Sequence, residues 1–435
     1  MMKKITAFIM AFVMCFFTAV ITFQITKTSA VPSDPVSQPD GTAENDDVIS
    51  IDEYIDGKYI TKELLDKLKA VAELYGEHYV DDDKIDPDYL LEYVMAGFTA
   101  GTEDDFGHYI NKENFEATMQ ELDGEYYGIG VTIVYNTAYN CIEILSVFPD
   151  SPAIEAGLLP GDLITHVAGE SVAEIGYYEA IDKVKGLEGE KVSLKVLRGV
   201  NYEESLEFNV PRRKVTEISV TWRMYEKAKD VAVVDIYNFN GKTPEQFVNA
   251  VNSAIDAGAK ALVFDVRGNP GGELYSICSI LDMLLPSGPI IRIDYKGEEQ
   301  DFDVQSGPEY FDFPMVVLCN EYTASAAELF TSALQDYGVA EVVGVNTYGK
   351  GTMQTIYSLG DGSGYAVTTA YYLPPKSPNY HGVGVVPDEI VEMPAEFRNV
   401  HISKLTVEQD VQLQAAVAIA KQVINKQSAD GTVTY

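Results

Sequence analysis

Residues 319–330, CNEYTASAAELF, place one serine hydroxyl, Ser325, where an apolar run gives way to a helical pattern. Ser325 and Glu328 have the S-x-x-E spacing of a capping box, so this serine could simply begin a helix. Alternatively, it could be a nucleophile, because the N–H groups that face outward at a helix N-terminus can stabilise an oxyanion. The two interpretations separate only if the chain also supplies a base and a second N–H donor.

The segment DVRGNPGG, residues 265–272, offers candidates for the second donor. It follows an apolar run that is expected to form a strand, and ligand sites of α/β proteins form beyond the carboxyl ends of such strands. Gly271 and Gly272 would let the backbone approach a substrate closely and direct N–H groups at it. The same Asn-Pro-Gly-Gly sequence could also be a plain turn.

A histidine base has few candidates, because the chain contains only five histidines. His78, His108 and His166 precede the predicted α/β region, and His401 follows its last strand. His381, in the loop-like sequence NYHGVG, is the one histidine that could serve.

A lysine can replace histidine if it is neutral, and burial lowers the pKa of a lysine. Lys350 lies between two glycines in TYGKGTMQT, after the apolar run AEVVGV, although it could equally be a solvated loop residue. Gln354 follows four residues later, and a neutral amide can hold an amine without favouring its charged form. In a regular strand the two residues would lie about 13 Å apart, so contact requires a bend, which Gly351 could supply.

These residues require a sheet and helices to position them, and strands and helices do alternate from residue 230 onwards. Continuous apolar strands between helices predict a largely parallel α/β sheet. Thr243 is expected to cap a helix, with Pro244 at its first position and Gln246 closing a capping box. The predicted strands are 231–239, 261–266, 315–319 and 340–345, and the helices are 243–257, 272–285 and 325–337.

The chain before residue 214 has a different composition. Residues 124–213 contain short strand-like runs and the turn sequence Pro160-Gly161-Asp162, which predicts a β-rich module. The helical periodicity of residues 62–79, and a second helix over 87–96, predict a small helical arm.

Length and charge restrict the class of protein. A chain of 435 residues exceeds a single core and suggests two or three domains. The net charge of -36 argues against a nucleic-acid or anionic-membrane surface, because both would repel the chain. Three of the four cysteines, Cys141, Cys278 and Cys319, lie in apolar contexts outside the first 30 residues, which predicts buried thiols rather than a disulfide framework.

The N-terminus resembles an export signal. Lys3 and Lys4 precede an uncharged stretch over residues 5–26, which is long enough to span a bilayer. Thr28-Ser29-Ala30 resembles a cleavage site, so both a retained anchor and a removed signal peptide are open. In both cases the rest of the chain is expected outside the cytoplasm. It would be anchored in the membrane if the segment is retained, and secreted if the chain is cleaved after Ala30.

Taken in order, a PDZ-like module, DVRGNPGG, TASAAE, GKGTMQ and HGVGVVPD resemble a carboxyl-terminal processing peptidase (tail-specific protease), a serine peptidase family with a Ser/Lys dyad. The likeness runs from about residue 60 to about residue 415. It implies Ser325 as nucleophile, Lys350 as general base and Gln354 as the residue that orients the lysine. It also implies an acyl-enzyme intermediate and no metal or cofactor. The implied oxyanion hole is the N–H of Ala326 with that of Gly271 or, preferably, Gly272.

The resemblance implies a multidomain α/β protein with a helical N-terminal arm, a β-rich PDZ domain and a crotonase/Clp-like α/β peptidase domain. The expected parts are 1–27 as signal peptide or membrane anchor, 28–49 as flexible linker, 50–123 as helical N-terminal region, 124–213 as PDZ domain, 214–395 as serine peptidase domain and 396–435 as C-terminal helical tail.

The PDZ-like module is expected to bind a peptide C-terminus with backbone amides of a loop, while the following strand pairs with the peptide. Ile181 and Val184, on the helix that walls the groove, are candidate pocket residues. The loop residues implied are Tyr127, Gly128, Ile129, Gly130 and Val131.

Some segments depart from the family pattern. The sequence TEDDFGHYI, residues 102–110, stands where the family has a Leu-Asp-Pro-His-Ser type of stretch. Residues 374–382 replace a segment that usually holds an arginine, and Tyr322 and Thr323 replace a glycine and a serine. The dyad is unaffected, so these changes concern substrate preference and regulation.

The resemblance implies a serine endopeptidase acting on exported or envelope proteins, which recognises accessible C-termini of protein or peptide substrates. The N-terminal helical region is a candidate for forming a homo-oligomer, and no nucleic-acid partner is expected. The alternative is a catalytically inactive, PDZ-bearing peptide-binding or scaffold protein.

If Lys350 is a neutral base, kcat/KM should rise with pH through one ionisation whose pKa lies below the ordinary lysine pKa of about 10.4.

Overall fold

The computed structural model describes residues 59–186, 188–199, 201–296, 302–398 and 400–430. The chain divides into two compact units, one over residues 24–102 and the other containing residues 103–435. The predicted export segment, 1–27, and the predicted linker, 28–49, lie outside the described residues. Among the helices that are described, none has both the length and the apolar character needed to cross a membrane.

The unit over residues 24–102 is helical where it is described. Helix α3, Lys62–His78, begins where the Thr61 hydroxyl accepts the N–H of Leu64. Helix α4, Pro87–Thr102, runs six residues beyond the predicted end at residue 96. The apolar stripe predicted on α3 exists but is exposed, since large side chains such as Val71 and Tyr75 are about half accessible.

A six-stranded sheet forms the centre of the peptidase region, in the order β10-β11-β12-β15-β16-β19. All neighbouring strands are parallel except β10 and β11, which confirms the predicted largely parallel sheet. The strands are β10 Val220–Tyr225, β11 Ala228–Ile236, β12 Ala261–Asp265, β15 Met315–Cys319, β16 Ala340–Gly344 and β19 Glu389–Ile390.

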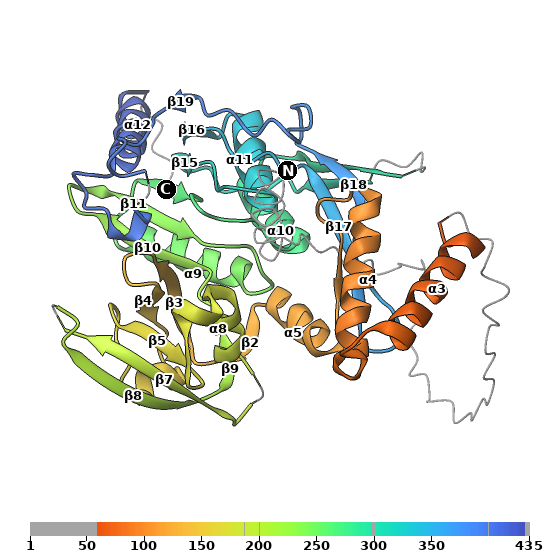
Figure 1. Ribbon diagram of the computed structural model, residues 1–435. Helices are drawn as coiled ribbons and strands as arrows, with labels where there is room; N and C mark the ends of the chain where they lie inside the picture. The colour runs from red at the N-terminus through yellow and green to blue at the C-terminus, as the bar shows by residue number, and fades with distance from the viewer. Residues whose placement is uncertain (1–58, 187, 200, 297–301, 399, 431–435) are drawn as a thin grey trace, which may run out of the picture. The chain divides into compact units, whose positions relative to one another are not determined.

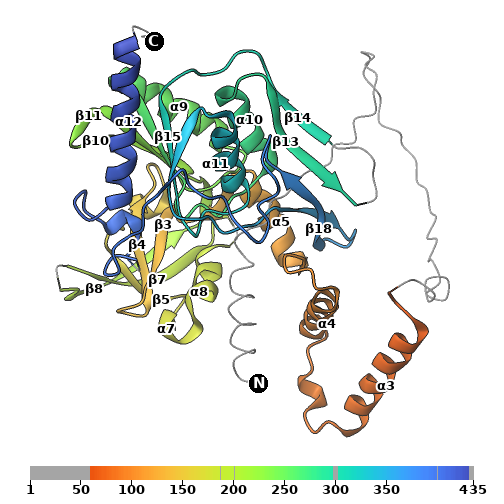
Figure 2. The same ribbon diagram turned by 90° about the horizontal axis from the view of Figure 1, so that it is seen from above.

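Helices cover both faces of this sheet because its strands are apolar on both sides. Successive residues of a strand point to opposite faces, so Ala232 and Val234 pack in the core beneath three helices, while Val231 and Val233 pack beneath α12. Figure 2 shows α12 on one side of β15 and α11 on the other. The helices are α9 Thr243–Asp256, α10 Leu274–Leu284, α11 Ala326–Tyr337 and α12 Val411–Asp430.

A second, antiparallel sheet lies beside the helices, in the order β1-β18-β13-β14, with β17 paired to β18 (Figure 1). Residues 50–123 were predicted to be helical, yet β1 pairs with β18, with His108 opposite Ala366. The segment around His108 is therefore part of the peptidase region. The strands are β1 His108–Ile110, β13 Gly288–Tyr295, β14 Phe302–Ser306, β17 Thr352–Ser358 and β18 Gly364–Leu373.

The β-rich module predicted over residues 124–213 contains a sheet in the order β3-β4-β5-β7-β8, with β6 paired to β5, and a separate β2–β9 pair. Its helices are α6 Pro152–Ala156, α7 Val172–Ile175 and α8 Tyr177–Val184, and α5, Lys112–Leu122, precedes it. The strands are β2 Glu125–Gly128, β3 Val131–Asn136, β4 Cys141–Val147, β5 Leu163–Val167, β6 Glu170–Ser171, β7 Lys191–Arg198, β8 Glu204–Pro211 and β9 Arg213–Thr216.

The predicted capping box at the start of α9 is wrong. Thr243 is already helical, and its hydroxyl accepts the N–H of Asn240. The Gln246 side chain accepts the N–H of Ser219 at 2.9 Å and donates to the carbonyl of Glu217 at 2.7 Å. Gln246 therefore ties the helix to the chain entering β10, a tertiary contact that the local spacing does not reveal.

The cysteines are buried thiols, as predicted. Cys141, Cys278 and Cys319 are free and buried. Burial raises the pKa of Cys141 to about 11 and that of Cys278 to about 12. A raised pKa removes the thiolate that a cysteine nucleophile requires, so these residues behave as apolar packing groups.

Candidate active site

Ser325 stands at the N-terminus of α11 and is fully buried. Its N–H donates to the Glu328 carboxylate at 2.8 Å, so the capping-box spacing is used. Its backbone, however, has φ 57° and ψ -120°. An ordinary N-cap residue has β-region dihedrals, and a non-glycine residue at positive φ costs about 1–3 kcal/mol. Capping alone does not need that conformation, which favours the chemical interpretation.

The glycine pair of the DVRGNPGG segment lies directly against Ser325. A Cβ on Gly271 would lie 2.7 Å from the Ser325 Cβ and 2.9 Å from the Ala326 nitrogen, so only glycine fits there. The Gly271 N–H is already donated to the Asn269 side chain at 2.8 Å. The N–H groups of Gly272 and Ala326, in contrast, have no acceptor within the described part of the chain. Of the two glycines, Gly272 is therefore the one whose N–H can still bind a ligand.

Lys350 is also fully buried. Its amine lies 4.3 Å from the centroid of the Phe106 ring. Its backbone N–H donates to the Glu328 carboxylate at 2.7 Å, and its carbonyl accepts the Tyr372 hydroxyl at 2.7 Å. The lysine is not the solvated loop residue that its flanking glycines could suggest, because the tertiary structure encloses it.

The Glu328 carboxylate connects the Ser325 and Lys350 segments. Besides the N–H groups of Ser325 and Lys350, it accepts the N–H of Gly349 at 2.6 Å and the Thr347 hydroxyl at 2.5 Å. Burial raises the pKa of Glu328, while these hydrogen bonds act in the opposite direction. The sequence predicted this residue only as a helix cap; its contacts with residues 347–350 could be found only in the folded chain.

Two tyrosines close the other side of Ser325. The Tyr372 hydroxyl lies 3.3 Å from the Ser325 Oγ, and the Tyr380 hydroxyl donates to the Ser325 carbonyl at 3.3 Å. Both rings are buried, and burial raises the pKa of both phenols, which therefore stay protonated. Tyr372 thus contacts the side chain of Ser325 and the backbone of Lys350 together. No pattern in the sequence singled it out.

Gln354 lies on β17, two residues after the strand begins, and is fully buried. Its Nε2 donates to the Thr368 hydroxyl at 3.0 Å and to the Thr352 hydroxyl at 3.3 Å. Its Oε1 is buried and has no hydrogen-bond partner in the described part of the structure. The strand register shifts at Met353 and Gln354. The bend was expected at Gly351, whereas this irregularity lies between Met353 and Gln354.

Gly351 fixes the turn between Lys350 and β17. A Cβ at this position would lie 2.2 Å from the Asn379 Oδ1 and 3.0 Å from the His381 nitrogen, so a larger residue would displace the Asn379 side chain. The Asn379 side chain donates to the Gly351 carbonyl at 3.1 Å, and the Gly351 N–H faces the His381 Nδ1 at 3.4 Å. His381, the alternative histidine base, therefore contacts the backbone next to Lys350 and the ring of Tyr371.

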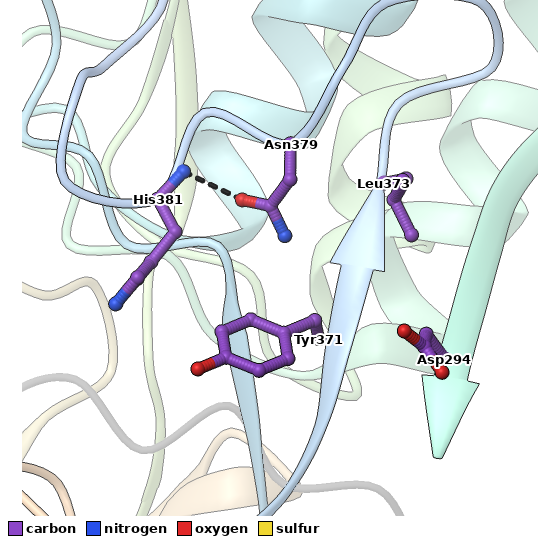
Figure 3. Close-up of a pocket in the computed structure, with 5 residues that line it drawn as sticks. All are labelled: Asp294, Tyr371, Leu373, Asn379 and His381. Atoms are coloured by element: carbon purple, nitrogen blue, oxygen red, sulfur yellow. Dashed lines mark hydrogen bonds between the residues drawn. The ribbon is translucent and has the colours of Figure 1, made fainter. Parts of the chain in front are cut away.

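A pocket of about 270 Å³ lies beside this turn, and Figure 3 shows the residues that line it. The His381 N–H points to the Asn379 Oδ1, and the Tyr371 ring faces them from β18. Because Asn379 and His381 also contact Gly351, the pocket borders the segment that carries Lys350. Its lining residues are Asp294, Tyr371, Leu373, Asn379 and His381.

Arg267 holds the glycine segment, residues 265–272, through buried ion pairs. Its buried guanidinium donates to Asp265 at 2.7 Å and to Asp410 at 2.8 Å, and it also reaches Gln412. The end of β12 is thereby tied to the start of α12. Breaking a buried, paired charge of this kind costs about 3–5 kcal/mol, so the C-terminal helix helps to hold the glycine segment in place.

Asp235 lies opposite Asp265 in the β11–β12 pair and gives a pH-dependent prediction. Burial, with the neighbouring Asp265, raises the pKa of Asp235 to about 6. The folded state then holds this proton more tightly than the unfolded state, so stability contributed by this group is lost as pH rises from about 4 to about 6. Asp235→Asn should remove about 3 kcal/mol of that pH dependence, measured by urea unfolding at pH 4 and pH 7. Equal pH dependence in both proteins would contradict the prediction.

The predicted peptide-binding residues are placed around one edge of the β-rich sheet. Tyr127 and Gly128 end β2, Ile129 and Gly130 form the turn, and Val131 begins β3. Strand β3 is the edge strand of its sheet. Ile181 and Val184 lie on α8 and pack on the core of this module. The Tyr135 ring on β3 contacts the Tyr177 ring on α8 at 5.5 Å between centroids, so the strand and the helix are neighbours.

Comparison with known proteins supports both regions. Residues 230–391 match the model of peptidase family S41, and residues 143–198 match that of the PDZ domain. The carboxyl-terminal-processing protease of Synechocystis sp. is 32% identical over 321 residues, which cover 73% of this chain and 74% of that protein. A probable CtpA-like serine protease of Staphylococcus saprophyticus is 31% identical over 337 residues, which cover 76% of this chain and 66% of that protein.

A crystal structure of an S41 protease from Bacteroides fragilis has a TM-score of 0.50 and 18% sequence identity, over 78% of this chain and 91% of that one. At this identity the structural likeness supports the fold. The relatives at above 30% identity, together with the matched family model, establish the relationship in sequence. The chain therefore belongs to peptidase family S41 and is a serine peptidase of the carboxyl-terminal-processing type.

Proposed function

We propose that the protein is an endopeptidase that cleaves peptide bonds with Ser325 as nucleophile and Lys350 as general base. The proposal rests on one observation: a buried serine at positive φ and a buried lysine have backbones held by the same carboxylate, that of Glu328. A helix cap and a surface lysine would need neither burial nor this shared partner.

In the proposed reaction the Ser325 Oγ attacks the scissile carbonyl while the Lys350 amine takes the hydroxyl proton. The N–H groups of Gly272 and Ala326 stabilise the oxyanion. The Lys350 ammonium then gives its proton to the leaving amine, and an acyl-enzyme remains on Ser325. Water hydrolyses this ester in a second step: Lys350 accepts a proton from the water and then gives it to the departing Ser325 Oγ, so that the serine hydroxyl and the neutral amine are both restored.

The β-rich module is proposed to bind the C-terminus of the substrate. Strand β3 is an edge strand, and an extended peptide can add to such an edge through backbone hydrogen bonds. The turn at Ile129 and Gly130 would supply amide groups for the terminal carboxylate, and Ile181 on α8 would contact the last side chain. A substrate with an amidated C-terminus should accordingly show a higher KM than the same substrate with a free carboxylate.

The test of the proposed function is digestion of β-casein by the full-length protein, together with labelling by a fluorophosphonate that reacts with activated serines. Cleavage is expected, and peptide mapping should place the label on Ser325. Cleavage with the label on another residue would overturn the assignment of the nucleophile. Binding of a peptide C-terminus without cleavage or labelling would favour the alternative, an inactive peptide-binding scaffold.

Export and association complete the proposal. The lysines and uncharged stretch of residues 1–30 support export, with the peptidase outside the cytoplasm and its substrates among exported or envelope proteins. The intact mass of the mature protein would show whether cleavage follows Ala30.

The exposed apolar side chains of α3 and α4 support association through this region, and light scattering should give the mass of an oligomer. A monomeric mass at all concentrations would exclude this association.

A further inference from the structure

The turn that precedes β1 lies against the strand that neighbours Gln354. Within it, the Asp104 carboxylate accepts the Thr368 N–H at 2.9 Å and the Thr368 hydroxyl at 2.7 Å. The same carboxylate accepts the N–H groups of Phe106 and Gly107, which fold the turn around it. Asp104 and Thr368 are 264 residues apart in the chain, so this contact exists only in the folded protein.

The hydrogen bonds from Gln354 to Asp104 have a fixed direction. A carboxylate can only accept hydrogen bonds, so the Thr368 hydroxyl must donate its single proton to Asp104. The oxygen of the same hydroxyl then accepts from Gln354, whose Nε2 lies 3.0 Å away. The order is therefore Gln354 to Thr368 to Asp104. The two ends of a side-chain amide differ only in which is donor and which is acceptor, and this chain of bonds decides between them.

This order of hydrogen bonds leaves the oxygen end of the Gln354 amide, Oε1, without a donor. With Nε2 held by Thr368 and Thr352, the Gln354 Oε1 is a buried acceptor that no described donor satisfies. Leaving a buried acceptor without a hydrogen bond costs about 1–3 kcal/mol of stability, so its presence requires an explanation. A donor that reaches the Gln354 Oε1 during catalysis would provide that explanation. The Lys350 amine is a candidate, because Lys350 precedes Gln354 by only four residues, both side chains are fully buried, and Phe106, in the same turn as Asp104, packs its ring 4.3 Å from that amine.

We propose that Asp104 is a positioning residue for the catalytic base: through Thr368 it presents the Gln354 Oε1, rather than the Nε2, to the Lys350 amine. This inference rests on the proposed Ser325/Lys350 mechanism. A neutral amine has two N–H donors and one lone pair. When the glutamine oxygen receives an N–H, the lone pair remains for the proton of Ser325. A flipped amide would donate to that lone pair and block the base.

The experiment compares two substitutions of Thr368 in the full-length protein. Thr368→Val keeps the shape but lacks the hydroxyl, and we expect kcat for a peptide substrate to fall about tenfold, with KM changed less than twofold. Thr368→Ser restores a hydroxyl and should recover kcat to within about twofold. The matched control is Thr369→Val, which removes the hydrogen bond between Thr369 and Thr355, 2.8 Å long, from the same strand. It should leave kcat unchanged.

A double-mutant cycle separates positioning from a general structural effect. In a Gln354→Ala background, Thr368→Val should cause no further loss of kcat, because the amide that Thr368 orients is gone. The same tenfold loss in both backgrounds would overturn the proposal, as would a Thr368→Val enzyme with unchanged kcat. These outcomes differ from failure of the proposed mechanism itself, which would show as activity retained in Ser325→Ala.

Asp104→Asn gives a second and independent measurement. Its amide has one acceptor oxygen where Asp104 accepts four hydrogen bonds, so the Thr368 hydroxyl becomes free to turn and the Gln354 amide loses its fixed direction. The expected result is again a fall in kcat of about tenfold, removed in the Gln354→Ala background. Full kcat in Asp104→Asn would exclude Asp104 as the positioning residue.

Discussion

Ser325→Ala is expected to lower kcat/KM for peptide hydrolysis by at least about 10⁴-fold, and Lys350→Ala by a similar factor. In the proposed mechanism, alanine at residue 325 removes the nucleophile, while alanine at residue 350 leaves a buried hydroxyl with no group to take its proton. Because both act in the same step, the double variant should be about as inactive as either single variant. The measurement is initial-rate cleavage of an unstructured peptide by each purified variant.

The control for these two variants is Ser332→Ala, which lies on the same helix and whose hydroxyl donates to the Leu329 carbonyl. It should keep activity within a fewfold of wild type, showing that loss of a buried hydroxyl from α11 is not sufficient. Activity that persists in Ser325→Ala or in Lys350→Ala would exclude this pair as nucleophile and base. A fold of the wild-type kind, shown by circular dichroism, would confirm that inactivity arises from chemistry.

Glu328→Gln is expected to cause the second largest loss, about 10²- to 10³-fold in kcat/KM, with a fall of roughly 10 °C in Tm. The carboxylate accepts three N–H groups and one hydroxyl. A glutamine amide has one acceptor oxygen, and its NH₂ group would face donors. At least one of these groups then loses its partner in a buried site, at a cost of about 1–3 kcal/mol each. Residues 347–350 should consequently shift, and Lys350 with them.

Kinetics and thermal unfolding should be measured together for this variant. Glu341→Gln, an exposed carboxylate on β16, is the matched control and should change neither quantity. A Glu328→Gln enzyme with wild-type kcat/KM would show that the shared carboxylate is dispensable for holding Ser325 and Lys350.

The elements that carry the site follow from local patterns. The apolar runs at β12 and β15 predict buried parallel strands because they are bounded by turn residues and alternate with helices. The start of α11 at Ser325 follows from the S-x-x-E spacing. The glycine pair at 271 and 272 was expected to allow close approach of the backbone, and a Cβ on Gly271 would indeed lie 2.8 Å from the Ala324 carbonyl oxygen. The strands and the helix start depend on a few neighbouring residues, whereas the partner of Gly271 does not.

Predictions that depended on a distant partner were wrong or incomplete. Gln246 was expected to close a capping box, but it bonds to residues near β10. The segment containing His108 was assigned to a helical arm, but it pairs with β18. Its three-residue strand is too short for periodicity to identify, and its stability comes from pairing with Tyr365 and its neighbours.

The sequence by itself determined which segments form the strands and helices of the parallel sheet, a serine at a helix start, a glycine pair after a strand and a lysine flanked by glycines. These depend on side-chain periodicity and backbone freedom, which act over a few residues. Only the tertiary structure decided that Glu328 holds the Ser325 and Lys350 backbones together and that Asp104 reaches Thr368. Hydrogen bonds between segments far apart in the chain exist only after the sheets have brought those segments into contact, and no local pattern encodes that partner.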